Sequence, residues 1–180
     1  PMNIEGLTLK LLTDTLNEEL LGSKIYKVYM PNPQSLLLLV RRTRDTSSLL
    51  ADMHNGSCVL YLPQQLPENP ETPPAFCMLL RKHIGNGRIT DISQPGLERI
   101  IKFEIEHLDE MGDLRHKKLI VELMGKHSNI IFCDEKGMIL DSIKHVSSHM
   151  SSVREVLPGR EYFIPNTRDK ENPLTVSELS

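Results

Sequence analysis

The densest polar chemistry of the sequence lies in the segment ELMGKHSNIIF. Gly125, Lys126, His127, Ser128 and Asn129 stand between two apolar runs that are typical of buried strands. Backbone donors at a glycine, a lysine ammonium and two polar side chains can form a rim that contacts a phosphate. The same residues can form a corner in which Ser128 and Asn129 satisfy nearby backbone groups. The pattern alone supports both interpretations equally.

Two further arrangements carry part of a catalytic or metal-binding motif. His145 and His149 in KHVSSHM have the spacing of a helical metal pair, but no glutamate follows the first histidine and the other ligands of a zinc site are missing from the pattern. Ser128 follows His127, yet neighbouring side chains on an extended segment point to opposite faces, and no GxSxG motif is present. We therefore expect neither a metal site nor a hydrolase.

The remaining motifs do not predict catalysis either. The glycines of HIGNGRI lack the full G-x-G-x-x-G pattern and follow a predicted helix, whereas that nucleotide-binding motif follows a strand. Four carboxylates lie on one strand edge and its turn, where a solvated face explains them: Glu104, Glu106, Asp109 and Glu110. We expect a protein that is not an enzyme and that needs no cofactor.

Three cysteines, Cys58, Cys77 and Cys133, are widely spaced and have apolar neighbours. An odd number with this spacing predicts buried, reduced thiols better than a disulfide framework or a metal site.

The chain of 180 residues has a formal net charge of −3 and a pI near 6.2. This balance argues against a general polyanion binder, which would carry a strongly basic surface. The basic residues instead form local groups: Arg41, Arg42 and Arg44; Arg81, Lys82, His83 and Arg88; and Arg115, His116, Lys117 and Lys118.

No membrane span is predicted, because the sequence has no window of about 18 apolar residues. No signal peptide is predicted either, because the N-terminus lacks a basic segment followed by an apolar one. We expect a cytoplasmic protein with no membrane contact. Pro1 precedes a methionine, as a residue left from an expression tag does. The final NPLTVSELS resembles the start of a helix, so we expect a piece of a longer protein.

Periodicity predicts the elements that must position these residues. Leucines recur at helical spacing from Gly6 to Leu21, and PAFCMLLRKHI predicts a second helix from Pro74 to His83, with Phe76, Leu79 and Leu80 inward. Strands are predicted on both sides of the second helix: KIYKVYM, SLLLLVRR, SSLLADM and CVLYL before it, as an antiparallel meander, and GRITDIS, ERIIKFEIEHL, KKLIVELM, NIIFCD and MILDSI after it.

Two segments outside these elements are predicted to be irregular. The proline-rich residues 62–74 are expected to form an exposed loop, since proline cannot donate to a sheet. Residues 144–165 are expected to form a strap anchored by Tyr162 and Phe163. Alternation in RIIKFEIEH predicts one buried and one solvated sheet face. The fold class predicted is α+β, a mainly antiparallel two-layer β-sandwich flanked by helices.

Several long segments resemble a known family. FCMLLRKHIGNGRITDISQPGLERII, VELMGKHSNIIFCDEKGMILDSIKHV and REVLPGREYFIP are similar to the N-terminal domain of the NFACT family, whose bacterial members are labelled fibronectin-binding protein A or RqcH. The opening IEGLTLKLLTDTLNEELLGSKIYKVYMPN resembles the first helix and strand of that family. The resemblance implies an NFACT N-terminal domain over residues 2–165, and a linker or the start of the next module over residues 166–180.

The resemblance implies a function in ribosome-associated quality control. Family members resemble elongation factors that engage a large ribosomal subunit carrying a stalled peptidyl-tRNA, recruit tRNA and support C-terminal alanine tailing. The tRNA-engaging Asp-Arg pair of the family matches Glu98 and Arg99 here, with glutamate in place of aspartate. Arg81, Lys82, Arg88 and Lys126 are further candidates for facing RNA. The alternative that the family label suggests is a fibronectin-binding surface adhesin.

The family domain is also similar in fold to the N-terminal domain of formamidopyrimidine-DNA glycosylases, which use an N-terminal proline as nucleophile. Those enzymes carry an acidic residue directly after the proline, whereas Met2 follows Pro1 here. The resemblance therefore implies the scaffold without the glycosylase activity. In this context we favour the corner interpretation of residues 125–129, with Lys126 alone facing RNA.

Overall fold

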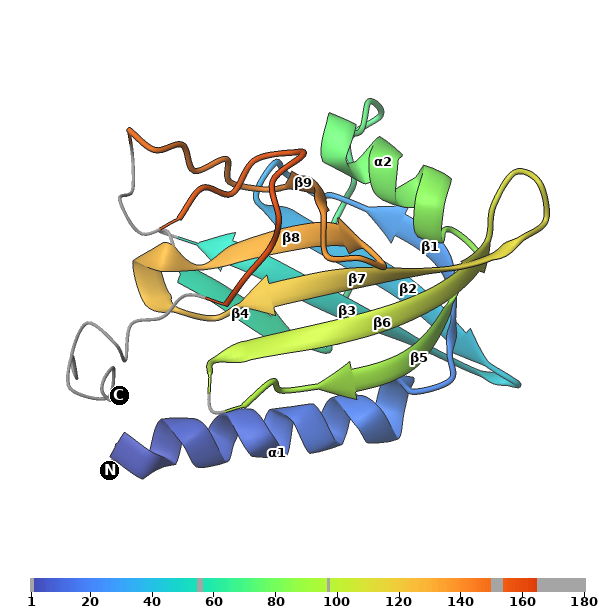
Figure 1. Ribbon diagram of the computed structural model, residues 1–180. Helices are drawn as coiled ribbons and strands as arrows, with labels where there is room; N and C mark the ends of the chain where they lie inside the picture. The colour runs from blue at the N-terminus through green and yellow to red at the C-terminus, as the bar shows by residue number, and fades with distance from the viewer. Residues whose placement is uncertain (1, 55–56, 97, 150–153, 165–180) are drawn as a thin grey trace.

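The computed structural model describes residues 2–54, 57–96, 98–149 and 154–164 (Figure 1). Two expectations fall outside this part of the chain. They are the tag origin of Pro1 and the linker or start of the next module over residues 166–180. The elements follow the order α1 (Met2–Leu20), β1 (Lys24–Tyr29), β2 (Ser35–Arg42), β3 (Asp45–His54), β4 (Ser57–Tyr61), α2 (Ala75–Ile84), β5 (Arg88–Ser93), β6 (Ile100–Leu108), β7 (Leu114–Glu122), the 3-10 turn η1 (Gly125–His127), β8 (Asn129–Asp134) and β9 (Ile139–Ser142). All nine predicted strands and both helices are present, and α1 begins four residues before its predicted start.

The described strands form one nine-stranded sheet in the order β4-β3-β2-β1-β5-β6-β7-β8-β9. Every neighbouring pair is antiparallel, which confirms the mainly antiparallel α+β prediction. The two predicted layers are therefore halves of a single sheet. The halves meet at β1 and β5, where the register includes one pair, Lys24 opposite Arg88, and Ile25 N–H donates to the Gly87 carbonyl at 2.7 Å. The predicted likeness to the glycosylase domain stays a prediction.

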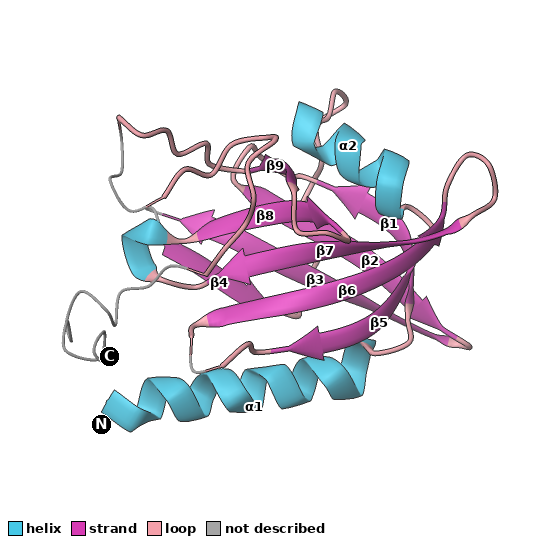
Figure 2. Cartoon of the chain, viewed as in Figure 1, coloured by secondary structure: helices cyan, strands magenta, loops and turns pink. Residues whose placement is uncertain are grey.

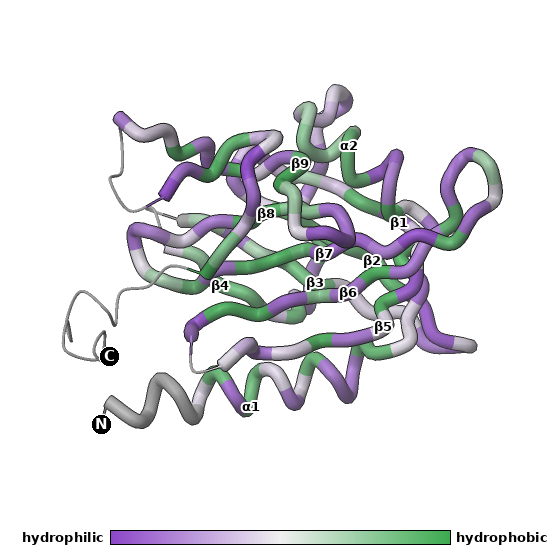
Figure 3. The backbone as a smooth tube through the Cα atoms, in the orientation of Figure 1, coloured by the Kyte–Doolittle hydropathy of each residue, from purple (hydrophilic) through white to green (hydrophobic). Residues whose placement is uncertain are grey.

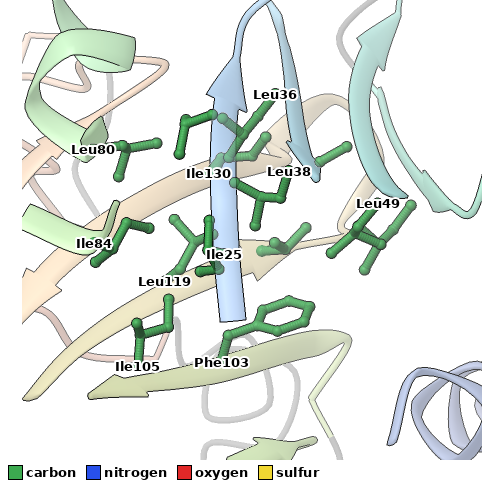
Figure 4. Close-up of a cluster of buried hydrophobic side chains, with 14 of the residues drawn as sticks. Ile25, Leu36, Leu38, Leu49, Leu80, Ile84, Phe103, Ile105, Leu119 and Ile130 are labelled. Carbon is green, nitrogen blue, oxygen red and sulfur yellow. The ribbon is translucent and has the colours of Figure 1, made fainter. Parts of the chain in front are cut away.

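The sheet folds so that β2 and β3 lie behind β6 and β7 (Figure 1). Side chains from both halves meet in one large core, which contains Leu36, Leu38 and Leu49 together with Phe103, Leu119 and Ile130 (Figure 4). Burial of apolar surface contributes about 25 cal/mol per Å², so the contact between the halves stabilises the fold.

The two helices cover different parts of this core (Figure 2). Helix α1 lies along β5 and contributes Leu9, Leu16 and Leu20, whereas α2 packs against β1 and β6. The buried side chains of α2 are Phe76, Cys77, Leu80 and Ile84. Leu79, predicted to face inward, is only partly buried beside the core.

The outer face of β6, β7 and β8 differs from the sequence prediction. Alternation along β6, visible in Figure 3, places Ile101, Phe103 and Ile105 inward as expected. The opposite face is not solvated throughout, because Ile100, Ile120 and Ile131 form a second buried cluster on it. The strap, defined as residues 143–149 and 154–164, covers this cluster through Val156 and Tyr162.

One of the two side chains predicted to anchor the strap does so. Tyr162 packs against the second cluster, as expected. The side chain of Phe163 does not anchor the strap, since this residue is 51% exposed. Its carbonyl does so instead, by accepting a hydrogen bond from Arg154 at 2.8 Å. Cys77 and Cys133 are buried free thiols, as predicted, whereas the free thiol Cys58 is only half-buried.

Candidate nucleic-acid interface

Glu98 and Arg99 lie in the turn between β5 and β6, and Arg99 directly precedes the first residue of β6. The Glu98 N–H donates to the Pro95 carbonyl at 3.3 Å, and the Glu98 carbonyl accepts from the Gln94 side chain at 2.9 Å. The Arg99 carbonyl accepts from the Leu123 N–H at 2.8 Å, which joins the turn to the end of β7. The backbone of the pair is therefore held on both sides, while Glu98 is half-buried and Arg99 is exposed.

Arg99 lines a pocket of about 290 Å³ between the start of α1, β4 and the end of β7. The other lining residues are mainly apolar, and include Leu9, Leu12, Leu60 and Leu123. A guanidinium has a planar face and five fixed donors, so at the edge of an apolar pocket it can stack on a base or bind a phosphate in a bidentate manner.

The loop of residues 125–129 is a corner, as favoured above. Gly125 has a φ of +57°, in the left-handed region that glycine adopts readily. The buried hydroxyl of Ser128 accepts from the Met124 N–H at 2.9 Å. The buried Asn129 carboxamide accepts from the Ile130 N–H at 2.8 Å and the Lys144 N–H at 3.0 Å, and it donates to the Lys144 carbonyl at 3.0 Å.

Lys126 is exposed on this corner, and its carbonyl accepts from the ammonium of Lys144 at 2.9 Å. The corner lies at the same end of the sheet as the Glu98–Arg99 turn, because Ile100 at the start of β6 pairs with Glu122 at the end of β7 (Figure 1). Lys126 is thus the one of the four additional candidates that the fold brings to the end where Glu98 and Arg99 lie.

Arg88 begins β5 at the opposite end of the sheet, where it pairs with Glu106 near the end of β6. Arg81 and Lys82 lie in the last turn of α2 (Figure 1). Arg81 donates to the Val28 carbonyl at 2.8 Å, and its guanidinium lies 5.5 Å from the centre of the Tyr29 ring. Lys82 follows on the same helix and is exposed. Arg88 donates to the Gly22 carbonyl at 2.7 Å. Arg81 and Lys82 both belong to α2. Arg81 and Arg88 have a structural role, because they bind backbone carbonyls in β1 and just before it.

Sequence analysis missed a buried acid close to the turn. Glu122 has no exposed surface, and its carboxylate accepts one hydrogen bond from Arg154 at 2.5 Å and one from the Tyr162 hydroxyl at 2.8 Å. Burial, and then the Glu122 charge, raise the pKa of Tyr162, so its hydroxyl stays protonated and donates. The available signal was that Glu122 shares its sheet face with Ile120 in LIVELM, where strand alternation places an acid beside apolar neighbours.

A second missed cluster lies at the opposite end, inside the core. The Lys117 ammonium is 3.1 Å from Nε2 of His107, both residues are buried, and the His83 ring lies 6.4 Å from the His107 ring. Burial is the largest cause that lowers the pKa of each of the three groups. Lys117, one of the third local group of basic residues in the sequence, is therefore buried.

Among the described residues, no three His, Cys, Asp or Glu side chains gather as a metal site. His145 contacts Asp141, with Nε2 and Oδ1 2.7 Å apart, and both His145 and His149 are exposed. No described helix has the length and the apolar character needed to cross a bilayer.

Comparisons with known proteins agree on one family. The model of the NFACT N-terminal and middle domains matches residues 5–180. The Rqc2 homolog RqcH of Bacillus subtilis is 42% identical over 178 residues, which cover 98% of this chain and 31% of that protein. The human ribosome quality control complex subunit NEMF is 25% identical over 174 residues, 97% of this chain and 15% of that protein. The chain thus spans under a third of the length of these relatives.

Solved structures show the same fold. The N-terminal part of the fibronectin/fibrinogen-binding protein of Streptococcus suis has a TM-score of 0.84 and 38% identity, over 89% of this chain and 60% of that one. The N-terminal domain of the fibronectin-binding protein PavA of Streptococcus pneumoniae has a TM-score of 0.83 and 37% identity, over 89% of this chain and 63% of that one.

Proposed function

This chain belongs to the NFACT family, and we propose that it is the tRNA- and large-ribosomal-subunit-binding domain of a cytoplasmic ribosome quality control factor. The factor would support C-terminal alanine tailing of stalled nascent chains. The human relative, named as a ribosome quality control complex subunit, and the Bacillus subtilis relative, named as an Rqc2 homolog, support this proposal. The domain would act by binding and not by catalysis.

The observation that carries the proposal is the Glu98–Arg99 turn. The backbone of this pair is hydrogen-bonded to Leu123, directly after β7, and to the Gln94 side chain, at one end of the sheet. An arginine donates to phosphates or to guanine edges, and a carboxylate accepts from the amino group of cytosine. The glutamate keeps the acceptor of the family's aspartate and places it one methylene farther out.

The overall charge fits local recognition better than general adhesion to nucleic acid. A domain of net charge −3 repels a polyanion at long range. Binding therefore depends on the few cations at the RNA-facing end, and we expect the affinity of the isolated domain to be weak and to fall with added salt.

The proposal is tested by Arg99→Ala in the full-length protein. We expect loss of tRNA recruitment and of tailing, measured by tRNA co-purification with the large subunit and by alanine incorporation into a stalled reporter. Arg44→Ala is the matched control, because it removes the same charge from the exposed turn between β2 and β3. Normal recruitment and tailing by the Arg99→Ala protein would refute the site.

A second function is suggested by the names of the structural relatives from Streptococcus, which are called fibronectin- or fibronectin/fibrinogen-binding proteins. The adhesin proposal predicts nanomolar binding of this chain to immobilised fibronectin at physiological salt, without competition by tRNA. Fibronectin binding that tRNA abolishes would instead indicate a shared cationic surface, and would favour the RNA-binding function.

A further inference from the structure

A second pocket lies beside the Glu98–Arg99 turn, on the outer face of the sheet. Its volume is about 380 Å³, within the range of sites that hold small molecules. Pro95 and Ile100, which flank the turn, both line it, and so do strap residues 162–164. We call it the strap pocket.

The floor of the strap pocket is apolar. Ile100, Ile120 and Cys133 line it, and each is at most 3% exposed. Burial raises the pKa of the Cys133 thiol to about 12, so the thiol carries no charge at neutral pH. Tyr162 and Phe163 add aromatic rings to the wall. Tyr162 is fixed by its hydrogen bond to Glu122, whereas Phe163 is 51% exposed. The lining therefore offers aliphatic and aromatic side chains to a flat apolar group.

The rim of the strap pocket is cationic. Lys102, Lys118 and Lys136 come from β6, β7 and the turn after β8. The lining itself contains these three lysines and no carboxylate, in a domain whose net charge is −3. The nearest acids lie beside the lining: Glu104 is 3.4 Å from the Lys102 ammonium, and the Asp134 carboxylate accepts from the Lys136 N–H. The rim therefore favours an anionic ligand.

We propose that the strap pocket binds one unstacked nucleotide of single-stranded RNA, with the base on the apolar floor and the phosphate at the lysines. Aromatic side chains that stack on bases, combined with cations that contact the backbone, are the usual means of binding single-stranded nucleic acid. Ammonium groups act as point charges that suit phosphate without requiring a fixed direction. The inference rests on the proposed function, because it assumes that RNA reaches this end of the sheet, but it concerns different side chains.

The first experiment is lysine acetylation of the full-length protein, read by mass spectrometry, with added AMP or UMP and with inorganic phosphate as the control ligand. We expect the nucleotides to protect Lys118 and Lys136 at concentrations where phosphate does not. Lys10, exposed on α1, should react equally in all samples. Equal protection by phosphate and nucleotide, or no protection at all, would overturn the proposal. Stronger protection by an acidic peptide such as oligoglutamate would do the same, because the partner would then be a protein.

Two variants separate the base from the phosphate. Phe163→Ala should weaken nucleotide protection roughly tenfold, the size expected for one base stacked on an aromatic ring, and should leave weak phosphate binding unchanged. Lys118→Gln should weaken both ligands. Unfolding midpoints of both variants are measured first, and we expect them to stay near that of the parent because both residues reach solvent. Unchanged nucleotide protection in Phe163→Ala would contradict stacking.

Nucleotide protection of the lysines can be judged separately from the test of the proposed function. Arg99→Ala should retain nucleotide protection of Lys118, since Arg99 lines the pocket beside α1 and not the strap pocket. A protein that recruits tRNA through Arg99 but shows no protected lysines would disprove only the strap pocket. Protected lysines in a protein whose tRNA recruitment does not depend on Arg99 would disprove only the site of the proposed function.

Discussion

The Tyr162 hydroxyl donates a hydrogen bond of 2.8 Å to the carboxylate of Glu122, a residue 40 positions earlier in the chain. Arg154 binds the other oxygen of the same carboxylate and also the carbonyl of Phe163. These contacts hold the strap against the end of β7, next to the strap pocket and the Glu98–Arg99 turn. The buried acid therefore positions two candidate RNA-binding surfaces without needing to touch RNA.

Removing the acid should destabilise the protein strongly. Glu122→Ala leaves Arg154, whose side chain is 10% exposed, without its buried partner, and the loss of one member of a buried ion pair costs about 3–5 kcal/mol. Tyr162→Phe removes one hydrogen bond and should cost about 1–3 kcal/mol. Urea denaturation measures both. Arg160→Ala is the control, since its exposed pair with Glu155 should contribute less than about 1 kcal/mol.

The corner of residues 125–129 should separate stability from binding. Asn129→Ala removes the amide that makes three hydrogen bonds to the backbone of Ile130 and Lys144, so we expect a loss of about 1–3 kcal/mol in the free energy of unfolding. Lys126→Ala should change stability by less than about 0.5 kcal/mol, because the side chain is exposed. Asn129→Ala protein that unfolds normally but no longer binds RNA would show that the corner recognises RNA directly.

Local periodicity was sufficient to predict the elements. The leucine spacing of α1 and the alternation of β6 are properties of neighbouring residues, and they report burial on one face. The joining of both strand series into one sheet was not predictable in this way. It depends on Lys24 pairing with Arg88, from segments separated by the proline-rich loop and α2.

The candidate site could be proposed from the sequence only where the chain itself brings residues together. Glu98 and Arg99 are adjacent in sequence, so the family resemblance could point to both. Glu122, Arg154 and Tyr162 meet because the strap folds back over β7, and no local pattern encodes that return. The basic residues Arg81 and Arg88 looked equivalent to Lys126 in sequence, but Arg81 lies on α2 and Arg88 pairs with Glu106 at the other end of the sheet.

The buried His107–Lys117 pair should make stability fall in mild acid. Burial lowers the pKa of His107 from its ordinary value of 6.5, as do its cationic neighbours, although Asp109 opposes this effect. The unfolded chain therefore takes up the proton first as pH falls through about 6.5, and the folded state loses stability until its own lower pKa is passed. His83, whose pKa burial also lowers, acts in the same direction.

Other groups titrate outside this window. The pKa of Lys117 is also lowered, from 10.5. Its effect on stability therefore has the same direction as that of His107 but occurs at higher pH. The pKa values of Asp109 and Glu155 are lowered from 3.8 and 4.5. The stability that these two carboxylates contribute is therefore lost at lower pH. His107→Gln, which keeps an acceptor for Lys117, should flatten the stability profile between pH 7 and pH 5. An unchanged slope in this variant, with His149→Gln as the exposed control, would rule out His107 as the cause.

The two ends of the sheet should respond differently when tRNA binding is measured against salt. Lys126 lies at the end that carries Glu98 and Arg99, so Lys126→Ala should weaken binding by the full-length protein and reduce the slope of log affinity against log salt by about 1, as expected for one lost phosphate contact. Arg88→Ala removes an equal charge at the far end, where its guanidinium binds the Gly22 carbonyl. It should leave the slope unchanged, apart from any effect of lower stability. Equal reductions in slope for both variants would mean that RNA wraps the whole domain, and that the turn at Glu98 and Arg99 is one contact among many.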